Sequence, residues 1–195
     1  MKKTLLILLL ACGCLPVFAQ TATQLEGDAR EKAISSILAA NDIRTTLQFR
    51  FVMTRHSALL TDNLVSRGRA AFSFPDKVRW EVEQPRPSVF VMNGETTADR
   101  RQQTLVRNVA KICEKGLINE TDFNVTVYGS PSQWQVDLVP LRRDLGQLFS
   151  LITLLADPAT GTLLSVVLTE TGGDITELEL SGIQKGQAID PKEFQ

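Results

Sequence analysis

The stretch from Ser66 to Glu95 constrains the fold more than any other part of this chain. Ala70, Phe72 and Phe74 alternate with Ala71 and Ser73, and residues 78–83 alternate valine or tryptophan with arginine or glutamate. A period of two, with one apolar and one charged face, is typical of a half-buried β-strand. Pro75-Asp76 favours a turn between the two runs. Pro85 and Pro87 then end the second run, because proline cannot donate to a ladder of hydrogen bonds.

Strands are also expected on both sides of this stretch. Residues 89–92 form an apolar run that ends in Asn93-Gly94, a strong hairpin signal. The other expected strands cover residues 45–55, 123–127, 134–138, 146–155, 163–169 and 175–180. The segment 145–156 also fits a helix, and the antiparallel surroundings favour the strand.

Two short helices complete the prediction. Residues 28–40 carry an apolar i, i+3, i+4 stripe, and Asp28 with Glu31 suggests a capping box. Residues 108–118 carry a narrower stripe, and near the C-terminus Phe194 is expected to pin the end of the sheet. The expected fold class is therefore α+β, mostly antiparallel β.

The N-terminal residues predict export. Lys2 and Lys3 precede an apolar core, and Val17-Phe18-Ala19 fits a cleavage site, so residues 1–19 are expected to be a signal peptide. Residues 20–195 would then form a single domain in the periplasm. Leu9-Leu10-Ala11-Cys12 also resembles a lipobox, and a form anchored through a lipid on Cys12 is the alternative. In the cleaved chain Cys113 is the remaining cysteine, and we interpret it as a small half-buried residue rather than a reactive thiol.

The sequence contains none of the common catalytic motifs. The 195 residues include 21 basic and 22 acidic side chains and one histidine, and the chain has no stretch typical of nucleic-acid binding. Motifs of serine hydrolases, zinc proteases and nucleotide-binding proteins do not occur in it. One histidine and one mature cysteine cannot build an ordinary zinc site. We therefore expect a protein that is not an enzyme and has no cofactor and no metal; a lipid-directed enzyme and a structural envelope protein are the alternatives.

An ordered set of residues in the central stretch resembles the bacterial lipoprotein carriers of the LolA type. The set consists of Gly68, Phe72, Pro75, Trp80, Gln84, Pro85, Asn93 and Gly94. A fainter likeness extends from about Glu26 to Phe194. The resemblance implies a strongly curved half-open β-barrel, with a short N-terminal helix and a lid helix that cover an apolar cavity. It also implies a periplasmic chaperone that binds the acyl chains of lipoproteins and carries them from the inner to the outer membrane.

The expected cavity is lined by apolar side chains of the strands and of the lid. Aromatic stripes on strands usually form an ordinary core, and that alternative stays open beside the ligand cavity. Shelter from water is worth about 0.8 kcal/mol for each CH2 group, or roughly 12 kcal/mol for one long acyl chain. The candidate lining residues are Phe49, Phe51, Met53, Phe72, Phe74, Val78, Trp80, Phe90, Met92 and Ile112.

Phe74 departs from the family pattern. The resemblance places an arginine there that latches the lid, whereas here Phe74 is expected to share a strand face with Ala70 and Phe72 and to line the cavity mouth. This departure leaves open a carrier of a non-protein envelope lipid or pigment for an export system, and a lipid on Cys12 would instead give an outer-membrane-anchored acceptor. The expected partners are an acylated lipoprotein or other lipid cargo, an inner-membrane release machinery and an outer-membrane acceptor. The protein itself is expected to be a monomer without a nucleic-acid partner.

Overall fold

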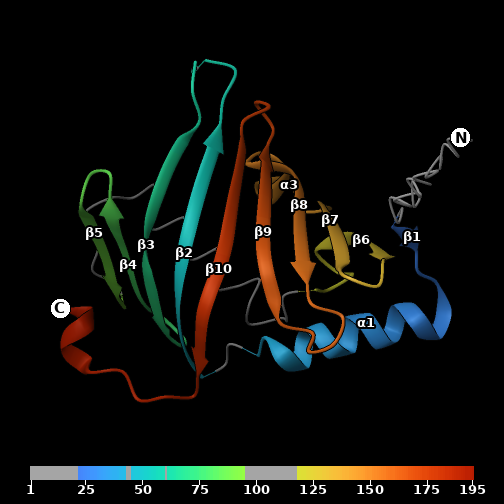
Figure 1. The fold of residues 1–195 in the computed structure, drawn as a ribbon, viewed down its shortest axis with the longest axis horizontal. Coiled ribbons are helices and arrows are strands. Elements are labelled where there is room, and N and C mark those ends of the chain that lie inside the picture. The colour runs from blue at the N-terminus through green and yellow to red at the C-terminus, as the bar shows by residue number, and fades with distance from the viewer. Residues whose placement is uncertain (1–21, 43–44, 60, 95–117) are drawn as a thin grey trace, which may run out of the picture.

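The computed structural model describes residues 22–42, 45–59, 61–94 and 118–195 (Figure 1). The elements of its first half are β1 (Thr23–Gln24), α1 (Gly27–Ala40), β2 (Thr46–His56), β3 (Leu64–Ser73), β4 (Lys77–Gln84) and β5 (Ser88–Asn93). Those of its second half are β6 (Phe123–Gly129), β7 (Trp134–Pro140), α3 (Arg143–Gly146), β8 (Phe149–Ala156), β9 (Leu163–Glu170), β10 (Ile175–Lys185) and the 3-10 helix η1 (Pro191–Phe194).

All the strands of these described ranges join one antiparallel sheet. Their order is β1-β6-β7-β8-β9-β10-β2-β3-β4-β5. The sheet is curved and open, with β1 and β5 at its two edges (Figure 1). Strand β10 joins the two halves, because Leu178 pairs with Met53 of β2 on one side and with Val166 of β9 on the other. The expected mostly antiparallel, curved fold is confirmed.

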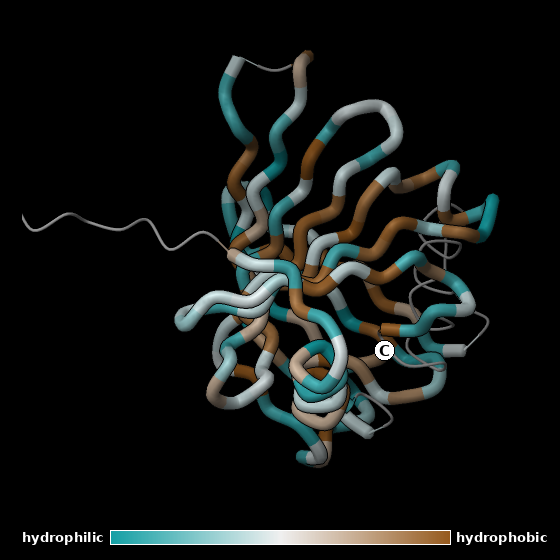
Figure 2. The backbone as a smooth tube through the Cα atoms, turned by 90° about the vertical axis from the view of Figure 1, so that its right-hand side faces the viewer, coloured by the Kyte–Doolittle hydropathy of each residue, from teal (hydrophilic) through white to brown (hydrophobic). Residues whose placement is uncertain are grey.

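Helix α1 covers one half of the sheet. Its Ala33 and Ile37 are fully buried and form a core with side chains of β6 to β9, such as Val136 and Leu154. The face of the sheet that packs against α1 is called the inner face below, and the opposite one the outer face. Along the strands, hydrophobic and hydrophilic residues alternate as the period of two requires (Figure 2).

Asn41 fixes the C-terminal end of α1 to the sheet. Its Nδ2 donates to the carbonyl oxygens of Ile37 and Gly161, at 2.8 and 2.9 Å. Its Oδ1 accepts from the backbone N–H of Leu163 at 3.2 Å. The β8–β9 hairpin and the helix end are therefore joined by one side chain. At the other end the expected capping box is wrong, because the helix begins at Gly27 and its N-cap, Glu26, makes no side-chain hydrogen bond.

The C-terminal helix η1 lies on the outer face beside β4 and β5. Arg79 Nη1 donates to the carbonyl oxygen of Glu193 at 3.1 Å, and Asn93 Nδ2 donates to that of Phe194 at 3.2 Å. Phe194 itself is buried. The expectation that Phe194 pins the end of the sheet is confirmed.

The structure shifts the bounds of one predicted strand, and two other predicted segments lie outside the residues that it describes. The strand predicted at residues 146–155 occupies 149–156, and the one-turn helix α3 precedes it with Leu145 buried. Except for the buried Ile118, the predicted lid helix at 108–118 lies outside the described residues, as does the predicted signal peptide. Within the described ranges, no helix combines the length and the apolar character needed to cross a bilayer.

Candidate ligand-binding face

The cross-strand register gathers apolar side chains on the inner face of β2 to β5. One row across the four strands runs through Phe49, Ala70, Trp80 and Phe90. The neighbouring row has one apolar residue from each strand as well, and a third row passes through Gly68. Side chains in such rows touch their neighbours because directly opposed Cβ atoms lie about 5 Å apart. We call this surface the aromatic face; it consists of Leu47, Phe49, Phe51, Met53, Phe72, Val78, Trp80, Val82, Phe90 and Met92.

Ring contacts give the aromatic face a defined shape. Phe51 stacks on Trp80 with ring centroids 4.2 Å apart, and Phe49 stacks on Phe72 at 5.9 Å. Phe49 also meets Trp80 edge to face at 6.3 Å. Stacked and edge-to-face arrangements of this kind attract one another beyond their buried area. The rings therefore form one connected surface.

Gly68 makes room for this ring arrangement. A Cβ atom at this position would lie 2.8 Å from Cζ of Phe51 and 1.9 Å from the carbonyl oxygen of Glu81. Both separations are shorter than a van der Waals contact, so a side chain on residue 68 would displace either the ring or strand β4. The glycine allows Phe51 to lie flat over β3.

The two halves of the inner face differ in how completely they are covered. Under α1 the core is sealed, and Ile37 and Val136 are both 0% exposed. On the aromatic face Phe49, Phe51, Val78 and Met92 are buried as well, yet the rings of Phe72, Trp80 and Phe90 are only half-buried. The cluster that contains Phe51 includes no residue of α1. The aromatic face therefore has apolar area left for a bound molecule.

The candidate lining residues predicted from the sequence can now be placed. The structure brings all of them together on the aromatic face except Phe74 and Ile112. Strand β3 ends at Ser73, so Phe74 lies in the turn that follows and does not continue the strand face of Phe72; its side chain is half-buried. The expected strand geometry at Phe74 is therefore wrong, and Ile112 lies outside the described residues.

The sequence reasoning missed several members of this cluster. Leu47 and Val82 complete the rows on β2 to β4, and Leu178, Leu180 and Ile183 join the cluster from β10. Leu178 and Leu180 alternate with glutamates, the same period-two signal that identified Trp80. What the sequence could not provide is the pairing of β10 with β2, which joins residues more than a hundred positions apart.

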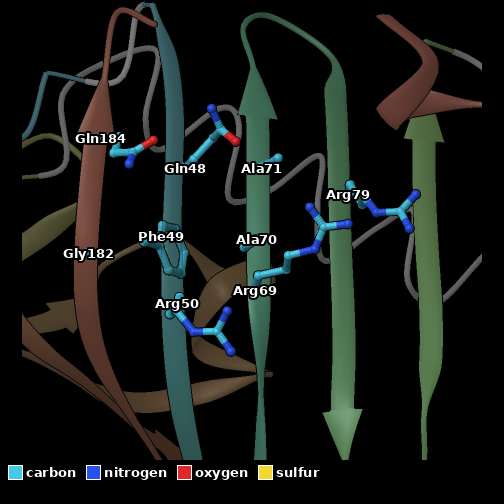
Figure 3. A pocket seen from close by; sticks show the side chains of 9 residues that line it. All are labelled: Gln48, Phe49, Arg50, Arg69, Ala70, Ala71, Arg79, Gly182 and Gln184. Carbon is cyan, nitrogen blue, oxygen red and sulfur yellow. The ribbon is translucent and has the colours of Figure 1, made fainter. Parts of the chain in front are cut away.

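The outer face of the same strands is polar and carries a pocket of about 240 Å3 (Figure 3). Its lining residues are Gln48, Phe49, Arg50, Arg69, Ala70, Ala71, Arg79, Gly182 and Gln184. Arg50 pairs with Glu83 at 2.7 Å, and both Arg69 and Arg79 pair with Glu81 at 2.9 Å.

The charges around this pocket compensate one another. Hydrogen bonds from Arg79, and then the charges of Arg69 and Arg79, hold the pKa of Glu81 below its ordinary value. Glu193 of η1 also lies 3.4 Å from Arg69 and 3.2 Å from Arg79. Each of the three arginines thus has a carboxylate partner, and the pocket offers an apolar chain far less than the aromatic face does.

Residues of the usual metal-binding types do not gather in the part of the chain that the structure describes. No group of three or more histidine, cysteine, aspartate or glutamate side chains there is placed to hold a metal ion. His56 ends β2 opposite Ile175 of β10, and Cys113 lies outside the described residues.

The fold and this face together define the class of protein. It is a protein built on a single open antiparallel sheet whose inner face is apolar. Residues 42–195 match the model of the family described as outer membrane lipoprotein carrier protein LolA, and the chain belongs to this family.

Two relatives of known name are similar along most of the chain. The outer-membrane lipoprotein carrier protein of Nitrosomonas europaea is 26% identical over 213 aligned residues, which cover 100% of this chain and 94% of the relative. The outer-membrane lipoprotein carrier protein of Methylococcus capsulatus is 25% identical over 166 residues, which cover 79% of this chain and 78% of the relative.

Similar solved structures include a LolA superfamily protein of Nitrosomonas europaea. It superposes with a TM-score of 0.44 at 10% identity, over 83% of this chain and 97% of that one. The complex of MucA and MucB from Pseudomonas aeruginosa superposes with a TM-score of 0.45 at 15% identity, over 86% of this chain and 61% of that one.

Proposed function

We propose that this protein is a periplasmic carrier that shelters the acyl chains of lipoproteins on its aromatic face and brings them from the inner to the outer membrane. The observation that carries the proposal is the half-buried state of the Phe72, Trp80 and Phe90 rings beside a fully sealed core. Membership of the carrier family and the two relatives named as carriers support the role. The name of the family describes transport and not a chemical reaction, which also supports a protein without catalysis.

An apolar surface suits an acyl chain because the attraction does not depend on direction. Each CH2 group kept from water contributes about 0.8 kcal/mol, so an apolar face can offset the shelter that a long chain loses when it leaves a membrane, without any charged contact. Rings at different depths, such as the buried Phe51 and the half-buried Phe72, can follow chains of several shapes. Release then requires only another apolar site of similar area.

The remaining parts of the proposal concern the route of the protein. Residues 1–19 act as a cleaved signal peptide, and residues 20–195 work as one carrier domain in the periplasm. The partners are an inner-membrane machinery that releases the acylated cargo and an outer-membrane acceptor that receives it. N-terminal sequencing of the exported protein tests the cleavage, and palmitate on Cys12 would show an anchored acceptor instead.

The two tryptophans allow a direct test of the binding face. The chain has two tryptophans, Trp80 on the aromatic face and Trp134 beside the core under α1. Bromine atoms on an acyl chain quench a tryptophan only at short range. In Trp134→Phe, a brominated long-chain fatty acid should strongly quench the remaining Trp80. In Trp80→Phe, the same ligand should leave Trp134 nearly unchanged. Equal quenching in both variants, or none in either, would contradict binding on this face.

A second experiment identifies the cargo. Native mass spectrometry of gently purified protein should show a bound acylated species, and depletion of the protein should strand lipoproteins at the inner membrane. Phe74, in place of the arginine that the family resemblance implies, favours the variant with a non-protein lipid or pigment as cargo. Normal lipoprotein sorting after depletion, with loss of another envelope lipid, would select that variant.

A further inference from the structure

Residues 186–195 are attached to the sheet at two separate places, and we call them the strap. At the start of the strap, the backbone N–H of Gly186 donates to the carbonyl oxygen of Thr46 at 2.9 Å, and Thr46 Oγ1 donates to the next carbonyl oxygen of the strap at 2.6 Å. At its end, hydrogen bonds from Arg79 and Asn93 hold η1 on the outer face. The strap therefore joins β2 to β4 and β5, and Figure 1 shows its course from the end of β10 to the far edge of the sheet.

The middle and the end of the strap are held differently. Residues 188–189 form no hydrogen bond with another described residue. At the end, Phe194 is 3% exposed, and the carboxylate of Glu193 lies beside both Arg69 and Arg79. Its Oε2 atom is buried and accepts no hydrogen bond, so this contact is ionic only. One buried ring, two hydrogen bonds and an ionic contact therefore fix the end of the strap.

The strands that the strap connects are also joined on the inner face, through their rings. Phe51 and Phe49 of β2 both contact Trp80 of β4 across β3, with ring centroids 4.2 and 6.3 Å apart. Arg79, which holds the strap, directly precedes Trp80 along β4, and the alternation of the strand places their side chains on opposite faces. The ring contacts and the strap therefore hold β2 and β4 together from the two sides of the sheet.

We propose that the strap controls how firmly the aromatic face holds its ligand. This inference rests on the proposed carrier function. Strand β5 is an edge of the sheet, η1 packs on both β4 and β5, and α1 contributes no residue to the cluster on their inner side. With the strap in place, Trp80 and Phe90 stay in position against the rings of β2. When its end is released, β4 and β5 move more freely relative to β2, and the ligand is held less firmly. Pro191 and Lys192 are exposed, so the strap is accessible from outside without entry into the aromatic face.

Variants of η1 test the proposal, with Trp80 as the reporter in a Trp134→Phe background. Phe194→Ala should make a brominated long-chain fatty acid dissociate about tenfold faster, a factor that corresponds to about 1.4 kcal/mol. Glu193→Gln should change the rate in the same direction but less, because it removes the ionic contact and keeps the buried ring. Lys192→Ala is the matched control, because the side chain of Lys192 is exposed and its loss should leave the rate unchanged.

Two further measurements distinguish a strap from a chain end that only adds stability. Hydrogen exchange in Phe194→Ala should accelerate in β4 and β5 and stay at the level of the parent in α1. Unfolding in urea should also be detected by Trp80, in Trp134→Phe, at a lower concentration than by Trp134, in Trp80→Phe. Exchange that accelerates equally in α1, or unfolding of both tryptophans at one concentration, would overturn the proposal, because η1 would then belong to a single cooperative core.

The same experiments keep this inference separate from the carrier function. A parent protein that shows no quenching of Trp80 by the brominated fatty acid would contradict the carrier function, and hydrogen exchange would still test the strap. Quenching in the parent, with the same dissociation rate in Phe194→Ala and Glu193→Gln, would overturn the strap and leave the carrier function intact. If Phe194→Ala does not fold, Glu193→Gln provides both measurements.

Discussion

Phe51 stacks on Trp80, with 4.2 Å between ring centroids and 23° between the ring planes, and its ring edge lies directly over the backbone of Gly68. The stack joins β2 to β4 across β3. We therefore expect Gly68→Ala to lower the free energy of unfolding by about 3 kcal/mol, since its Cβ would collide with both Phe51 and the Glu81 carbonyl. Urea denaturation measures the loss. Gly172→Ala serves as the control, because a Cβ there meets no atom within 4 Å; similar losses in both variants would contradict the role of the close approach.

Asn41 should be important for the docking of α1. Its amide makes one hydrogen bond to Ile37 of the helix and two to Gly161 and Leu163, which join the helix end to the β8–β9 hairpin. Removing them leaves partly buried backbone groups without a partner, so Asn41→Ala should cost about 2 kcal/mol of unfolding free energy. Asn124→Ala, at an exposed position of β6, should cost much less. Hydrogen exchange of α1 should accelerate only in the Asn41 variant, and protection equal to that of the parent would refute this role.

Position 74 should accept a charge that position 51 cannot. Phe74 is half-buried in the turn after β3, so in Phe74→Arg the guanidinium can reach water while its stem covers apolar surface. The melting temperature should stay within a few degrees of the parent, an allowance of about 1 kcal/mol. Retention of a bound acyl ligand should change. Phe51→Arg, in contrast, would bury an unpaired charge and should fail to fold stably. An insoluble Phe74→Arg would show that Phe74 belongs to the core.

Acid should weaken the outer face of the sheet through Glu81. Because Arg79 and Arg69 lower the pKa of Glu81 in the folded state, its contribution to stability is fully present above the ordinary pKa of 4.5. It is lost as the pH falls through the lowered folded value. Glu81→Gln should therefore be less stable than the parent by about 1 kcal/mol at pH 7, and the difference should shrink towards pH 3. Unfolding in urea across this range measures it, with the exposed Glu179→Gln as control. A difference that does not change with pH would contradict the linkage.

The sequence pattern predicted most strands because their two faces differ. Trp80 and its neighbours alternate with charged residues, which fixes both the strand and the side that faces inward. The segment around Leu145 was harder, since a buried residue in a one-turn helix and one in a strand produce the same short apolar run. Phe74 was misplaced on the strand for a related reason: alternation cannot show where β3 stops before Pro75.

The candidate site was predictable in its residues but not in its extent. Alternation identified Phe49, Phe51 and Trp80 as inward-facing, whereas the contribution of Leu178 and Leu180 depends on a pairing between β2 and β10 that is distant in sequence. The exposed fraction of a side chain also cannot be predicted from the alternation of residues in a sequence. The contrast between the sealed core under α1 and the half-buried aromatic face emerges only when the strands are assembled.

That contrast has an evolutionary consequence. Because the interior beneath α1 is closed by Ile37, Val136 and Leu154, much of the free energy of folding resides away from Phe72, Trp80 and Phe90. Substitutions among the half-buried rings can therefore alter ligand preference while the rest of the sheet keeps the chain folded. A scaffold divided in this way can acquire new cargoes by changing a few side chains on one half of one face.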